Sequence, residues 1–119
     1  MEKKVICKYS ALRRLDTMCM AIACLSSALE DEVKYADVGH AIDDKYKADC
    51  ARICNECIPG IENAMWMDLE TVDKRRFMNR CKEIKRNLKD VRKYNIPEAI
   101  KPAYEFAVKT FKIIVSTAN

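Results

Sequence analysis

The hydrophobic residues of this chain recur at helical spacing. After Ser10, a residue suited to a helix N-cap, apolar positions follow one another at spacings of three and four residues up to about Glu32. This stripe consists of Leu12, Leu15, Cys19, Ile22, Leu29 and Val33, with Ser26 in its one polar gap. Further apolar positions lie around the circumference, at Met18, Ala21, Ala23 and Leu25. The pattern predicts a helix that is buried on more than one side, either inside a bundle or against a second subunit.

A second helix is predicted from about Asp37 or His40 to Ile58, where Pro59-Gly60 is expected to end it. Its apolar positions fall within about 120° of one another on a helical wheel. They are Ile42, Tyr46, Cys50, Ile53, Cys54 and Cys57. The cysteines are therefore expected in the middle of a buried face.

Residues 61–94 contain neither glycine nor proline, and their pattern is helical throughout. A break is expected near Asp68 or Thr71, because both residue types suit an N-cap. Whether the segment forms one helix or two stays open. The apolar residues before the break are Ile61, Met65, Trp66 and Leu69, and the stripe after it is Phe77, Cys81, Ile84, Leu88 and Val91.

The last helix is expected to begin between Glu98 and Lys101, because Pro102 suits the first turn of a helix. Its main apolar face consists of Ile100, Tyr104, Ala107, Phe111 and Ile114. A second apolar line, roughly opposite, contains Ala99, Ala103, Phe106 and Ile113. We expect Phe106 and Ile113 to support self-association as a homodimer. The alternative is that this helix contacts two neighbours within one bundle.

The chain has two glycines and three prolines in 119 residues, which leaves few chain reversals. Folds with many strands need turn signals every 8 to 12 residues and are disfavoured. The fold class predicted is all-α, an antiparallel bundle of four to five helices in which residues 1–119 form a single domain.

The compartment expected is the cytoplasm. The longest uncharged run, residues 17–29, would span roughly 20 Å as a helix, which is short of the ~30 Å hydrocarbon core, so no membrane contact is expected. Residues 21–24 look somewhat like a lipoprotein cleavage box, but Asp16 interrupts the preceding apolar region. The seven cysteines are an odd number without Gly- and Pro-rich loops between them, which favours reduced thiols.

Charge is distributed unevenly along the sequence. Residues 30–73 carry 4 basic and 12 acidic side chains, a net charge of −8, whereas residues 74–93 carry 10 basic and 2 acidic, a net charge of +8. On a helical wheel eight of these basic residues share a sector of about 120°. They are Lys74, Arg75, Lys82, Lys85, Arg86, Lys89, Arg92 and Lys93.

These eight residues are hereafter the basic ribbon. It is suited to the phosphates of a nucleic acid or to an acidic protein, although no aromatic residues are interleaved with it and no nucleic-acid motif is present. The alternative is a solvated surface that the acidic second helix neutralises by lying beside it.

The spacing of Cys50, Cys54 and Cys57 raises the possibility of a metal or redox site. On a regular helix Cys50 and Cys57 lie about 10 Å apart along the axis, too far to share one zinc ion. Other ligands would have to come from His40, the other cysteines, or methionines 18, 20, 65 and 67 around Cu(I). A helix ending at Ile58 would place the Cys54–Cys57 pair at its C-terminus, where the dipole raises a thiol pKa.

Catalytic motifs are absent: there is no phosphate-binding glycine loop, no Glu-x-x-His pair and no nucleophile elbow. We expect no cofactor and no enzymatic activity. The function expected is that of a small non-catalytic interaction protein, such as an adaptor, immunity protein or inhibitor, which binds another macromolecule through helix surfaces, and the partner class favoured is a protein. The alternatives are a nucleic-acid-associated protein that uses the basic ribbon and, third, a cysteine-based metal-binding bundle.

Overall fold

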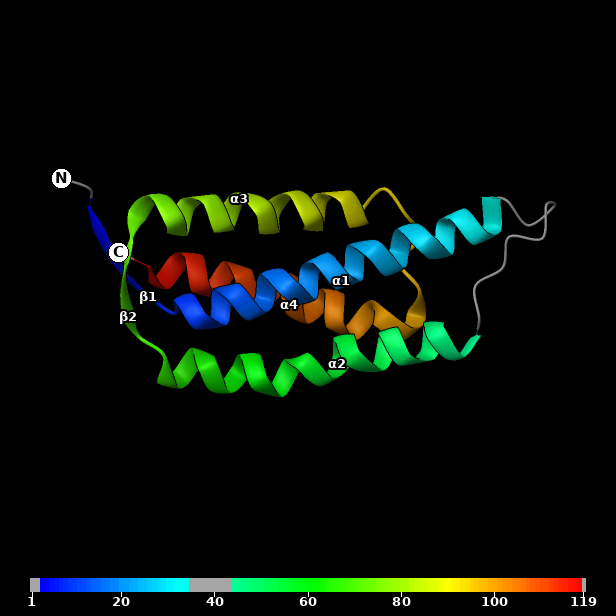
Figure 1. Cartoon of the computed structure of the whole chain (residues 1–119), viewed down its shortest axis with the longest axis horizontal. Helices are drawn as coiled ribbons and strands as arrows, with labels where there is room; N and C mark the ends of the chain where they lie inside the picture. Colours follow the sequence, from blue (N-terminus) through cyan, green and yellow to red (C-terminus); the bar gives the residue numbers. More distant parts are fainter. Residues whose placement is uncertain (1–2, 35–43, 119) are drawn as a thin grey trace.

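A computed structural model describes residues 3–34 and 44–118 of the chain. Four α-helices are present in these residues: α1 (Tyr9–Lys34), α2 (Asp44–Met67), α3 (Lys74–Val91) and α4 (Lys101–Thr117). A short 3₁₀ helix, η2 (Glu98–Ile100), precedes α4, and two strands, β1 (Lys4–Cys7) and β2 (Glu70–Asp73), pair at one end (Figure 1). The predicted all-α antiparallel bundle is confirmed, with the small sheet as an addition.

Helix α1 is the central element of the bundle. It packs against α2, α3 and α4, and Figure 1 shows it between α3 and α2. Its predicted stripe is buried at Leu12, Leu15, Cys19, Ile22 and Ser26, and Met18 and Leu25 are buried as well. The all-round apolar character of this helix therefore follows from its three helical neighbours.

The strands form an antiparallel pair in which Val5 lies opposite Val72. The inward-facing residues Val5, Cys7 and Val72 are buried against the end of the bundle. The prediction of helix throughout residues 61–94 is therefore wrong over β2. Because its partner strand is more than 60 residues away in sequence, local periodicity gives no sign of the pairing.

The predicted break lies where expected, but neither Asp68 nor Thr71 is the N-cap of α3. That residue is Asp73, whose Oδ1 accepts hydrogen bonds from the backbone N–H groups of Arg75 (2.7 Å) and Arg76 (3.2 Å). The following stripe is buried as predicted, at Phe77, Cys81, Ile84, Leu88 and Val91. The start of the last helix is also confirmed, with Pro102 in the first turn of α4.

The prediction that Pro59 ends the second helix is wrong. Helix α2 continues through Pro59 to Met67. One buried stripe runs across the proline, from Ala51 and Cys54 to Ile61 and Ala64, while Pro59 itself is exposed. Burial of this stripe against the bundle offsets the hydrogen bond that proline cannot donate. The predicted start at Asp37 or His40 lies outside the described residues.

The face predicted for α2 is also too wide. Cys54 is buried and Cys50 and Cys57 are half-buried, but Tyr46 and Ile53 are both more than half exposed. The buried side of α2 is thus centred on Ala51 and Cys54 rather than on the whole predicted sector.

Candidate functional site

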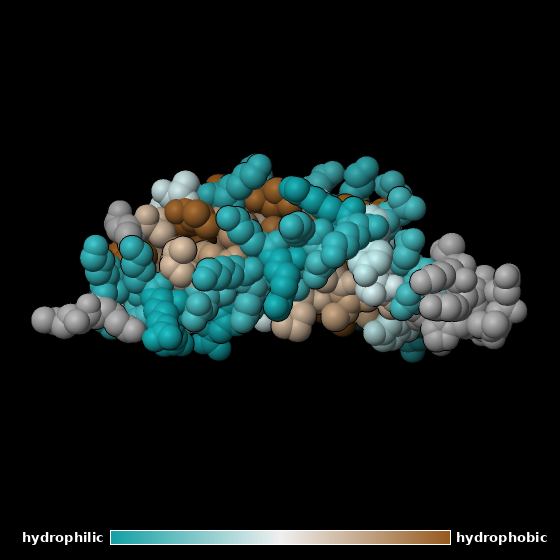
Figure 2. Space-filling view, turned by 90° about the horizontal axis from the view of Figure 1, so that it is seen from above, coloured by the Kyte–Doolittle hydropathy of each residue, from teal (hydrophilic) through white to brown (hydrophobic). Residues whose placement is uncertain are grey.

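The basic ribbon covers the outer side of α3 and the residues that follow it. All eight of its side chains are exposed, as predicted for a surface helix. In Figure 2, which looks onto α3, hydrophilic side chains stand over the middle of this face and apolar surface is visible beside them. The ribbon therefore borders apolar surface.

Two adjoining cavities between α3 and α4 form what we call the α3–α4 groove. The first, of 640 Å³, lies toward the end of α3, and its lining residues are Lys85, Arg86, Leu88, Lys89, Arg92, Val108, Phe111 and Lys112. The second, of 480 Å³, lies toward the start of α3, and its lining residues are Phe77, Met78, Cys81, Lys82, Lys85, Phe111, Lys112, Val115 and Ser116. The two adjoin at Lys85, Phe111 and Lys112, which line both.

The groove has an apolar floor and a cationic rim. Leu88 and Phe111 at its base are each 8 % exposed, whereas Met78 and Val115 on its lips are 45 % and 44 % exposed. Five members of the basic ribbon line the groove, and α4 adds Lys112. The remaining three, Lys74, Arg75 and Lys93, do not line either cavity.

The contribution of α4 to this site was missed by sequence reasoning. Phe111 was predicted as core, and Val108, Lys112 and Val115 were assigned to no site. Their spacing of three to four residues places them on one side of α4 and is the signal that would have indicated a groove wall. That they meet α3, and not another helix, depends on tertiary packing.

The cationic rim is not neutralised within the described chain. Among residues 3–34 and 44–118, no carboxylate forms an ion pair with Lys82, Lys85, Arg86, Lys89 or Lys112. The alternative that acidic α2 lies beside the ribbon is wrong, because α3 packs against α1, α4 and the strands while α2 lies on the opposite side of α1 (Figure 1).

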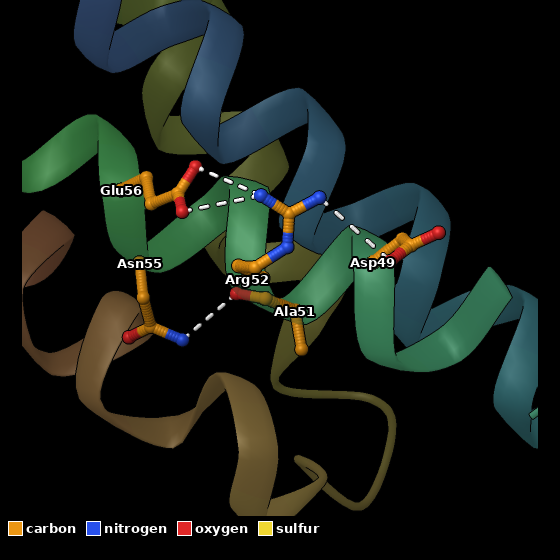
Figure 3. A network of polar contacts seen from close by, with 5 residues as sticks. All are labelled: Asp49, Ala51, Arg52, Asn55 and Glu56. Carbon is orange, nitrogen blue, oxygen red and sulfur yellow. Dashed lines mark hydrogen bonds and ion pairs between the residues drawn. The ribbon is translucent and has the colours of Figure 1, made fainter. Parts of the chain in front are cut away.

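Helix α2 instead pairs its own charges. Figure 3 shows Arg52 between Asp49 (3.7 Å) and Glu56 (3.2 Å) on successive turns of the helix. The side-chain amide of Asn55 donates to the carbonyl of Ala51 (2.8 Å) in the same view, and also to the carbonyl of Ala99 (3.0 Å). These polar contacts of α2 are thus structural, whereas the groove rim has cations without a carboxylate partner in the described part of the chain.

Two further arginines of α3 face α1 rather than the groove. Arg80 Nη1 lies 2.8 Å from Oδ2 of Asp16, a carboxylate whose side chain is only 4 % exposed. The hydrogen bond to Asp16, followed by one to Tyr9, raises the pKa of Arg80. Arg76 lies over the ring of Tyr9, 5.2 Å from its centroid. Both contacts lie outside the basic ribbon, in agreement with the positions of Arg76 and Arg80 on the helical wheel.

A third cavity, of 360 Å³, is lined by Ser10, Arg13, Arg14, Thr17 and Arg80. Although it is rich in arginine, two of its cations already contact carboxylates, Arg80 with Asp16 and Arg14 with Asp68 at 3.8 Å. Its lining lacks the apolar floor of the α3–α4 groove. It is therefore a weaker candidate for a partner site.

The cysteines are free thiols without a disulfide among them. Helix α2 continues beyond the Cys54–Cys57 pair, so the expected position at a helix C-terminus is wrong. Burial, with smaller effects of Cys57 and Cys50, raises the pKa of Cys54 to about 11. Within residues 3–34 and 44–118 no three His, Cys, Asp or Glu side chains group to hold a metal ion, and His40 lies outside these ranges.

These thiols are expected to differ sharply in reactivity. Cys24 is the one exposed cysteine of the seven, whereas burial raises the pKa of Cys19 to about 12 and that of Cys54 to about 11. Because a raised pKa keeps the thiol protonated until the pH approaches that value, about one Cys54 in a thousand is thiolate at pH 8. Iodoacetamide at pH 8, followed by peptide mass spectrometry, should modify Cys24 first and leave Cys19 and Cys54 protected until urea unfolds the chain. Equal native labelling of Cys54 and Cys24 would contradict this assignment.

The two residues predicted for self-association lie in different environments. Phe106 is half-buried and packs against the core, while Ile113 is 38 % exposed. Ala103, on the same predicted line, is fully buried. The second apolar line of α4 is therefore not a continuous exposed strip, and the homodimer stays a prediction.

Comparisons with protein-family models, with curated proteins and with solved structures found no match to this chain. None of the helices in the described residues is both long and apolar enough to cross a membrane. The candidate site is therefore assigned from the geometry of this chain alone.

Proposed function

We propose that this protein is a non-catalytic interaction protein that binds another protein through the α3–α4 groove. The observation that carries the proposal is the combination of an apolar floor with rim cations that form no ion pair with a carboxylate of residues 3–34 and 44–118. Apolar surface supplies most of the affinity in protein interfaces, while charges at the edge steer association and select the partner. An acidic protein surface with a protruding apolar element is the complement of this groove.

A nucleic-acid partner is the alternative, and the exposure of the whole basic ribbon favours it. Against it, single-stranded nucleic acids bind to open aromatic faces, and the two aromatic residues in the groove, Phe77 and Phe111, are 5 % and 8 % exposed. A duplex would contact the phosphate-binding cations and leave the apolar floor unused. A protein partner would contact both the rim cations and the apolar floor, and we favour it for that reason.

Charge reversal at the rim tests this function. In affinity capture from extract of the native host, the K85E/R86E/K89E variant is expected to lose at least about 90 % of a protein that wild type retains after nuclease treatment. The three side chains are exposed and lack carboxylate partners in the described chain, so the fold should be preserved. Circular dichroism and urea unfolding of the variant check that its fold and stability are preserved.

The matched control is K3E/K4E/K101E, which makes the same change in net charge at exposed positions outside the groove. It should retain the partner at the wild-type level. Equal loss from both variants would indicate a nonspecific charge effect and contradict the proposal. If nuclease treatment alone removed everything bound to the wild type, the nucleic-acid alternative would be supported instead.

A further inference from the structure

The α3–α4 groove has the dimensions and chemistry of a receptor for a helix. Resting on the proposed function, we infer that its occupant is an acidic, amphipathic α-helix of the partner protein. The helix would lie along the groove with its apolar stripe on the floor and its carboxylates against the rim.

The length of the groove sets the length of the occupant. On α3 the lining residues extend from Phe77 to Arg92, and on α4 from Val108 to Ser116. From Phe77 to Arg92, the C-cap of α3, the chain advances by 15 residue steps, or about 22 Å at 1.5 Å per residue, so the matching partner helix has about four turns. Its apolar residues would recur at spacings of three and four, as in other helices that bind grooves.

The geometry of two adjacent helices explains why a third helix fits. Helices α3 and α4 run antiparallel, because the end of α3 and the start of α4 meet at Arg92, whose Nε donates to Tyr104 Oη (3.4 Å). The furrow between two such helices receives the side-chain ridge of a third at the usual interaxial distance of about 8–10 Å. The exposed lip residues Met78 and Val115 are placed to contact that ridge.

The charges of the rim specify an acidic occupant whose carboxylates are unevenly distributed around its helix. Lys82, Lys85, Arg86, Lys89 and Arg92 lie on the α3 side, whereas Lys112 is the cation that α4 contributes. Carboxylates should therefore be concentrated on the flank of the partner helix that faces α3. The ion pairs between the rim cations and the partner's carboxylates would stay near solvent. They should therefore contribute salt dependence and selectivity more than affinity.

A synthetic peptide provides the probe. It has about 18 residues, with leucines at spacings of three and four, glutamates concentrated on one flank and blocked ends. Its control has the same composition in scrambled order, so that net charge is kept and the apolar stripe is lost. We expect fluorescence anisotropy to show at least about tenfold tighter binding of the amphipathic peptide, with a gain in its helicity by circular dichroism. Equal binding of both peptides would overturn the inference, because charge alone would then explain the association.

Two protein variants test whether the peptide contacts the apolar lips of the groove. M78Q/V115N changes exposed apolar residues of the lips without altering charge, and we expect it to weaken peptide binding about tenfold. M20Q/I53N makes the matched change at Met20 and Ile53, which are 52 % and 51 % exposed outside the groove, and should bind as wild type does. An unchanged affinity of M78Q/V115N for the peptide would contradict apolar contact between the peptide and the lips of the groove.

Other occupants give distinct results in the same assay. Tighter binding of a single-stranded oligonucleotide, or of vesicles containing anionic phospholipid, than of the amphipathic peptide, with no effect of M78Q/V115N, would overturn the inference. If the peptide fails to bind while capture of a host protein still depends on Lys85, Arg86 and Lys89, the helix inference is wrong and the proposed function stands. If rim reversal leaves capture unchanged, the proposed function fails as well.

Discussion

Replacing Arg80 with methionine is expected to lower the free energy of unfolding by about 3 kcal/mol at neutral pH. The guanidinium contacts Oδ2 of Asp16 at 2.8 Å, and that aspartate is buried within the first third of α1. The other carboxylate oxygen of Asp16, Oδ1, has no hydrogen-bond partner within the described residues. Without Arg80 the buried carboxylate would lose its nearest cation, which costs more than the ion pair itself contributes. Urea unfolding followed by circular dichroism measures the change.

Two further variants of the Arg80–Asp16 ion pair provide the controls. Arg80→Lys keeps a positive charge and should lose less stability than Arg80→Met. Adding Asp16→Asn to Arg80→Met removes the unpaired charge, so this double variant should be more stable than Arg80→Met alone. A loss below about 1 kcal/mol for Arg80→Met would show that the contact behaves as an exposed ion pair and would contradict its structural role.

Replacing Pro59 with alanine is expected to raise the free energy of unfolding by about 2 kcal/mol. Pro59 lies inside α2 and is exposed, so the substitution removes no buried contact. Alanine restores a backbone N–H that can donate to the carbonyl of Asn55, four residues earlier, and removes the ring that crowds that carbonyl. Thermal and urea unfolding of the variant test the expectation.

Gly60→Ala is the neighbouring comparison. Apart from Gly60, its chain neighbours and the adjacent backbone of α2, no atom of the described residues lies within 4 Å of the position that an alanine Cβ would occupy at Gly60, and the residue is inside the same helix. Its gain should be about 1 kcal/mol, smaller than that of Pro59→Ala. If both substitutions destabilise the protein, the helix does not continue through these residues and α2 is wrongly assigned.

The helical bundle was predictable because burial follows helical spacing. The stripe from Phe77 to Val91 is buried as its spacing indicated, and the apolar circumference of residues 12–29 indicated burial on more than one side, which the packing of α1 against three helices provides. The prediction that Pro59 ends the second helix is wrong, because burial of Ile61 and Ala64 outweighs the cost of a proline inside a helix. The strand at 70–73 was missed because its partner, residues 4–7, is distant in sequence.

The candidate site was predictable only in part. The basic ribbon could be derived from charge spacing on one helix, and all eight of its residues are exposed. The apolar floor could not, because it depends on which side of α4 meets α3. Phe111 and Lys112 belong to the site only once the two helices are packed side by side.

The central claim is that the α3–α4 groove binds the partner, and NMR mapping of the bound surface tests it most directly. Backbone amide shifts of the ¹⁵N-labelled protein would be followed as the captured partner, or the acidic amphipathic peptide, is added. We predict that the largest changes fall on residues 77–92 and 108–116, which line the two cavities. Changes concentrated on α2, with the groove residues unperturbed, would contradict the claim.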